Sequence, residues 1–128
     1  MTTLFVCVTC RGGADAPQEP RPGARLLAAL QGQDEGDLDS VAVECLSNCQ
    51  RGCTAAVGAP GKWTYVIGNL DPDRHVRDVL DFARLHRAHA EGLPVWRERP
   101  AHIRQNTMAR VPPLPLPLAP KPSAKELT

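Results

Sequence analysis

The stretch VAVECLSNCQRGC (residues 41–53) joins a short apolar run to three cysteines spaced four residues apart. Its first part, VAVEC, is short and rich in β-branched residues, which predicts a strand ending at Cys45. The chain has five cysteines, and the other two, Cys7 and Cys10, stand at the end of a similar run, TLFVCV (residues 3–8). Both cysteine groups are therefore predicted to follow a strand directly.

A helix is predicted between these two strands. The segment ARLLAALQGQ (residues 24–33) carries leucines at helical spacing. A strand–helix–strand unit favours a right-handed crossover and a parallel pair. Parallel neighbours have their carboxyl ends at the same edge of a sheet, so the two cysteine-bearing loops are expected to meet there. That meeting is the geometric requirement for a site made of four thiolates.

The next segments complete an α/β pattern. TAAVGAPGKWTYVIG (residues 54–68) alternates apolar and polar residues around a Pro-Gly turn and predicts a hairpin. The longest helix is expected to follow, with Asp71 as its N-cap and Pro72 as its first residue. The predicted order is β-α-β-β-β-α, an α/β fold with a mixed sheet and a C-terminal extension.

The chain is expected to divide into three parts. Residues 1–92 are predicted to form the domain, and residues 93–110 a basic extension that packs partly through Trp96. The last part, residues 111–128, contains six prolines and is predicted to be an extended, mobile tail.

Composition narrows the classes of function. A length of 128 residues fits one domain with a modest core, and a net charge of +1 predicts neither a nucleic-acid nor a membrane partner. The N-terminus has none of the features of a signal peptide, and no apolar run is long enough to span a bilayer. We therefore expect a cytoplasmic protein, in which clustered cysteines indicate metal or redox chemistry more often than disulfides.

Four thiolates bind either an iron–sulfur cluster or tetrahedral zinc, and the spacing alone leaves both open. Loop N–H groups around Ser47 and Asn48 are candidate donors to the sulfurs, and Gly52 permits close approach of the backbone. Arg11 and Arg51 flank the cysteines. They are expected either to raise a reduction potential and attract an acidic partner, or to be ordinary solvated arginines. Dithiol chemistry at the Cys-x-x-Cys of residues 7–10 is a third alternative, but a long loop separates it from the next helix.

Three segments, CVTCRGG (residues 7–13), VAVECLSNCQRGC and KWTYVIGNLDPDRHVRDVL (residues 62–80), together resemble the thioredoxin-like [2Fe–2S] ferredoxins. CLSNCQRGCT and PVWRERP resemble more closely a bacterial family of unknown function described as metal-binding, whose members often occur near cobalamin or metal-uptake genes. This resemblance covers about residues 3–110. It implies a thioredoxin-like ferredoxin fold.

The resemblance also implies a ligand set, because the family ligands fall on Cys7, Cys10, Cys45 and Cys49. The first loop is shorter than in the ferredoxins, and Cys53 stands where they tend to have no ligand, so it is an alternate ligand or an additional thiol. The implied function is that of a non-enzymatic electron carrier with a [2Fe–2S] cluster. Its implied partners are a reductase and an acceptor enzyme, in cobalamin synthesis or in iron and cobalt metabolism, and a homodimer is compatible with the family. The alternative is a zinc- or cobalt-binding protein without redox activity.

Overall fold

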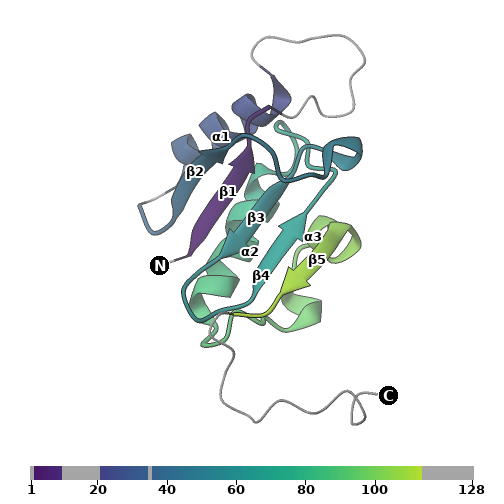
Figure 1. The fold of residues 1–128 in the computed structure, drawn as a ribbon. Coiled ribbons are helices and arrows are strands. Elements are labelled where there is room, and N and C mark those ends of the chain that lie inside the picture. The colour runs from purple at the N-terminus through teal and green to yellow at the C-terminus, as the bar shows by residue number, and fades with distance from the viewer. Residues whose placement is uncertain (1, 10–20, 35, 114–128) are drawn as a thin grey trace, which may run out of the picture.

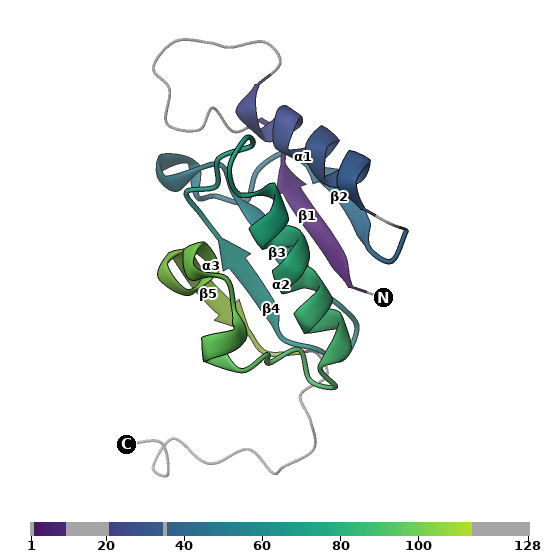
Figure 2. The ribbon, with the colours of Figure 1, turned by 180° about the vertical axis from the view of Figure 1, so that it is seen from behind.

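The computed structural model describes residues 2–9, 21–34 and 36–113. These residues form a five-stranded sheet with the strand order β2-β1-β3-β4-β5. Figures 1 and 2 show that the helices lie together on one face of this sheet. The helices and strands are β1 (Thr3–Cys7), α1 (Pro22–Gln33), β2 (Asp39–Val43), β3 (Ala55–Gly58), β4 (Thr64–Ile67), α2 (Val76–Ala88), α3 (Ala101–Asn106) and β5 (Thr107–Val111).

The predicted pairing of the first two strands is confirmed. β1 and β2 are parallel neighbours, with Phe5 opposite Val41. The predicted hairpin is confirmed as well, because β3 and β4 pair antiparallel with Val57 opposite Tyr65. The sheet is therefore mixed, with one parallel pair at one edge, and the α/β class is as expected.

The expected start of the longest helix is wrong. α2 begins at Val76, four residues after Pro72. Asp71 instead closes a separate turn, because its carbonyl oxygen accepts the N–H groups of Arg74 and His75 and its carboxylate accepts that of Asp73. The N–H of Asp71 in turn donates to Nδ1 of His75 at 2.8 Å. Asp71 thus holds a turn that precedes the helix and is not its N-cap.

Residues 93–110, expected to form a basic extension, supply one more helix and most of one more strand. β5 pairs antiparallel with β4 along the free edge of the hairpin. Trp96, expected to pack, is 62% exposed, and Arg104 lies over its ring at 5.2 Å. Ile103 of α3 is fully buried. The Pro-rich tail falls outside the described residues from position 114 onward.

The core lies between the sheet and the helices. Leu4 and Val6 of β1 and Tyr65 and Ile67 of β4 are fully buried on this face. The rings of Tyr65 and Phe82 meet edge to face at 5.0 Å, which joins the sheet to α2. In the part of the chain that the structure describes, no helix is long and apolar enough to cross a membrane.

Candidate metal centre

The loop between β2 and β3 passes over the carboxyl end of β1. β1 lies between β2 and β3 in the sheet, so residues 44–54 must cross it. The thiol of Cys7 donates to the carbonyl of Glu44 at 3.5 Å, and its backbone N–H donates to the carbonyl of Thr54 at 3.1 Å. The end of β1 and the start of the second cysteine loop therefore meet at one edge of the sheet, as expected for parallel neighbours.

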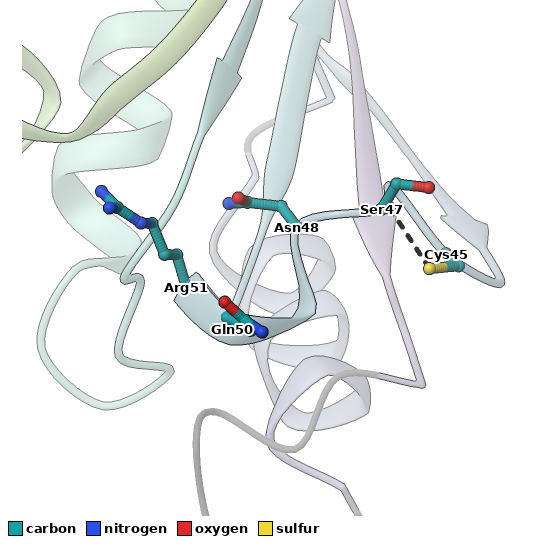
Figure 3. Close-up of a pocket in the computed structure, with 5 residues that line it drawn as sticks. All are labelled: Cys45, Ser47, Asn48, Gln50 and Arg51. Atoms are coloured by element: carbon teal, nitrogen blue, oxygen red, sulfur yellow. Dashed lines mark hydrogen bonds between the residues drawn. The ribbon is translucent and has the colours of Figure 1, made fainter.

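The loop surrounds a solvent-open hollow of about 410 Å³ lined by Cys45, Ser47, Asn48, Gln50 and Arg51 (Figure 3). Cys45 is exposed at its rim, and the N–H of Ser47 donates to the Cys45 sulfur at 3.2 Å. Ser47 has a φ of 57°, a left-handed conformation that turns the chain sharply at this point. An N–H donor stabilises negative charge on a sulfur that binds a metal.

Contacts on both sides hold the rest of the loop. The N–H of Arg51 donates to the carbonyl of Asn48 and closes a short 3₁₀ turn, Cys49–Arg51. The Asn48 amide donates to the hydroxyl of Thr54 at 3.2 Å. Gly68, directly after β4, lies against this turn, where an added Cβ would be 2.7 Å from Nδ2 of Asn48 and 2.9 Å from the carbonyl oxygen of Arg51. The loop therefore requires glycine at position 68, which the sequence analysis missed although a glycine directly after a strand is a signal of close approach.

Cys53 ends the loop in the core. Its side chain is fully buried, and its backbone exchanges two hydrogen bonds with Leu70, at 3.2 and 3.0 Å. Gly52 connects Cys53 to the 3₁₀ turn and does not line the hollow. The structure therefore separates Cys53 from Cys45, which stands at the solvent-open rim.

The first turn of α1 packs against the end of β1. Pro22 and Gly23 are buried, and a Cβ added to Gly23 would lie 2.0 Å from the carbonyl oxygen of Cys7. The guanidinium of Arg21 donates to the carbonyl of Thr9 at 3.0 Å. The positive end of a helix is thereby placed beside a cysteine-bearing strand end, an arrangement that favours negative charge there.

A stacked histidine pair lies on the other side of Gly68. The rings of His75 and His102 are 3.7 Å apart, and Nε2 of His102 donates to the carbonyl of Gly68 at 3.1 Å. Burial, together with the charge of a protonated His102, holds the pKa of His75 below its ordinary value. Neither histidine belongs to a sequence motif, because the two come from distant segments that only the packing of α3 brings together.

A family model for DUF1636, described as a protein of unknown function, matches residues 4–113. The chain belongs to the DUF1636 family. No curated protein matches it. The matched residues include both cysteine groups and also α3 and β5, so the family's shared region extends to the last strand of the sheet.

The solved structures that resemble this DUF1636 protein include two of a ferredoxin from Aquifex aeolicus. A thioredoxin-like [2Fe–2S] ferredoxin from Aquifex aeolicus is 18% identical, with a TM-score of 0.55 over 88% of this chain and 94% of that chain. A cysteine-to-serine variant of that Aquifex aeolicus ferredoxin is 20% identical, with a TM-score of 0.50 over 76% of this chain and 95% of that chain. The predicted thioredoxin-like ferredoxin fold is thereby confirmed.

The structure brings some of the predicted site residues of the DUF1636 protein together, and others lie outside the described residues. Cys7 and the loop of Cys45 meet, and Ser47, Asn48 and Arg51 line the hollow. Cys49 opens the 3₁₀ turn beside it, whereas Cys10 and Arg11 lie outside the described residues. Among the side chains that the structure describes, no three of Cys, His, Asp or Glu form a group that could hold a metal ion.

The described residues of this site have the chemistry that a metal or cluster bound by thiolates requires. Cys45 stands at the rim of a hollow and accepts a backbone N–H on its sulfur, and Arg51 lines the same hollow. These are the donors and the charge that a buried or half-buried metal thiolate needs. The thiol of Cys7 contacts the carbonyl of Glu44, the residue that precedes Cys45.

Proposed function

We propose that this DUF1636 protein is an electron carrier that binds a [2Fe–2S] cluster through Cys7, Cys10, Cys45 and Cys49. One observation carries the proposal: the loop of Cys45 crosses the end of β1 at Cys7, and Ser47 already donates a backbone N–H to the Cys45 sulfur. Proteins generally bind [2Fe–2S] clusters through four cysteine thiolates, and hydrogen bonds to the sulfurs tune the potential. The fold shared with the Aquifex aeolicus ferredoxin is consistent with this use of the sheet edge.

The bound cluster supplies one-electron transfer. The chain's own residues set the conditions for it. The Ser47 N–H stabilises negative charge on a thiolate ligand, and the positive charge of Arg51 beside the hollow favours the reduced, more negative state of the site. Asn48 and Gly52 hold the loop in shape, and Arg11, next to Cys10, is proposed to add a second positive charge.

Because electrons must enter and leave, the proposal includes a reductase and an acceptor enzyme as partners, and no catalytic residues of the protein's own. The proposed setting is the cytoplasm, in cobalamin synthesis or in iron and cobalt metabolism. That setting rests on the family resemblance alone. Homodimerisation belongs to the same proposal and is checked by the mass of the purified protein in solution.

The experiment that tests the proposal is a metal and sulfide analysis of protein purified without oxygen, together with its visible spectrum. We expect about two irons and two sulfides per chain and an absorption band that dithionite bleaches. About one zinc per chain, with no colour and no sulfide, would indicate a zinc-binding protein instead of an electron carrier. Disulfide reductase activity in metal-free protein would instead support dithiol chemistry.

A further inference from the structure

The sheet has one face that carries no helix in the described part of the chain (Figures 1 and 2). Side chains alternate between the two faces of a strand. Leu4 and Val6 are fully buried against the helices, so Phe5 between them points to the bare face, where it is only partly buried. Val66, between the buried Tyr65 and Ile67, points the same way.

One row of residues crosses this face from edge to edge. Successive strand registers place one residue of each strand side by side, which gives the row Val41, Phe5, Ala56, Val66 and Ala109. Every member is apolar, and Val41 is 40% exposed. A solvated face of an antiparallel or mixed sheet is normally polar. A continuous apolar row across five strands therefore indicates a surface that another segment covers.

A groove of about 380 Å³ adjoins the row at the amino end of β1. It is lined by Thr3, Phe5, Gly58, Ala59, Pro60 and Thr64. Thr64 is also the residue that pairs with Val111, the last residue of β5. Val111 is 49% exposed and Pro113, two residues later, is buried. The chain thus leaves the sheet beside the groove.

The sequence that follows has the composition to cover such a surface. Residues 114–118 are LPLPL, with leucines at 114, 116 and 118. Proline has no N–H and is tolerated in sheets only at edges, so Pro115 and Pro117 reduce the backbone pairing that this segment can make. The leucine side chains are then the groups that supply its contact with a surface.

The segment is also long enough. From β5 to β1 there are three strand spacings, or about 14 Å at about 4.8 Å each. Five residues in an extended conformation rise about 3.3 Å each and span about 16 Å, and leucines at alternate positions then lie on one face. Residues 114–118 can therefore reach from the edge at β5 to the groove beside Phe5.

We propose that residues 114–118 bind across the bare face of the chain's own sheet, with the leucines on the part of the row formed by Phe5, Ala56, Val66 and Ala109 and in the adjoining groove. The attachment at Val111 gives the segment a high effective concentration at this surface, which a second copy of the chain lacks. The stiffness of a Pro-rich segment lowers the conformational entropy lost on binding. The groove lies at the opposite end of β1 from Cys7, so this contact is independent of the proposed metal site.

The test uses the full chain with methyl-labelled leucine in NMR. The chain has two phenylalanines, Phe5 and the buried Phe82. The ring signals of Phe5 are therefore those that disappear in a Phe5→Leu variant. We expect cross-relaxation between the Phe5 ring and methyl groups of Leu114, Leu116 or Leu118. Leucine signals at random-coil positions without such contacts would overturn the proposal. Contacts seen only between differently labelled chains in a mixed sample would also overturn it, in favour of a second copy.

A second measurement uses a dye that fluoresces on apolar surfaces. The triple variant L114S/L116S/L118S should raise the fluorescence of 8-anilinonaphthalene-1-sulfonate several-fold, because it uncovers the row. The control variant K121Q/K125Q changes the same tail outside the proposed contact and should leave the dye signal unchanged. Equal signals from wild type and the leucine variant would contradict the proposed binding.

Discussion

Two cysteines of the second loop have opposite environments. Cys45 is exposed at the rim of a hollow and accepts an N–H on its sulfur, whereas Cys53 is fully buried in the core. We predict that Cys45→Ser abolishes the dithionite-sensitive absorption, because a serine oxygen is a poor replacement for a thiolate ligand. Cys53→Ala should keep the iron-to-protein ratio of the wild type. Loss of iron from Cys53→Ala but not from Cys45→Ser would reverse the proposed roles.

His86 is a buried titratable residue that links three segments. Its Nε2–H donates to the carbonyl of Trp63 at 2.7 Å, and its Nδ1 accepts the hydroxyl of Thr2 at 2.9 Å. Both hydrogen bonds use the neutral ring. Burial lowers the pKa of His86 below its ordinary value of 6.5, since the interior disfavours the charged ring.

The consequence is a pH dependence of stability. The unfolded chain binds the proton at His86 more readily than the folded chain does, so the free energy of unfolding should fall as the pH drops below about 6.5. One such group contributes a slope of at most about 1.4 kcal/mol per pH unit. Urea unfolding of His86→Gln between pH 7.5 and 5 should show a flatter dependence, with the remaining slope due in part to His75. An unchanged slope would mean that His86 is not protonated on unfolding.

The contact between α1 and β1 holds the helix close to the strand that ends at Cys7. A Cβ on Gly23 would meet the carbonyl oxygen of Cys7 at 2.0 Å, whereas one on Gly32, in the same helix, would meet nothing within 4 Å. We predict that Gly23→Ala lowers the free energy of unfolding by about 1–3 kcal/mol through this overlap. Gly32→Ala should raise it by up to about 1 kcal/mol, because alanine favours the helix. Denaturant titrations of both variants test this prediction. Equal changes in the free energy of unfolding would show that α1 and β1 can move apart to accommodate a methyl group at little cost.

β5 extends the sheet beyond the segment expected to contain the domain, and α3 packs against α2. Ile103 is fully buried and Val95 is 49% exposed, and both belong to residues 93–110. Ile103→Ala should cost about 2–5 kcal/mol of stability by leaving a cavity. Val95→Ala should change it by no more than about 0.5 kcal/mol. Tryptophan fluorescence and circular dichroism should report one shared unfolding transition for both variants. Two separate transitions would indicate that residues 93–110 unfold independently of the rest of the chain.

The elements whose patterns are local could be predicted from the residues alone. Apolar runs ending at Cys7 and Cys45, with leucines at helical spacing between them, were enough to predict a parallel pair with two cysteine loops at one edge, because the handedness of the crossover leaves few alternatives. The Pro-Gly turn between Val57 and Trp63 was enough for the hairpin.

Features that depend on contacts between distant segments could be found only from the packing of the folded chain. TMARV becomes β5 because β4 offers an unpaired edge, and its own alternation is too weak to predict a strand. The burial of Cys53, the stacking of His75 on His102 and the need for glycine at position 68 arise where the second cysteine loop, the end of β4 and α3 pack together. No local pattern records these contacts, because each is stabilised by residues tens of positions apart in the chain.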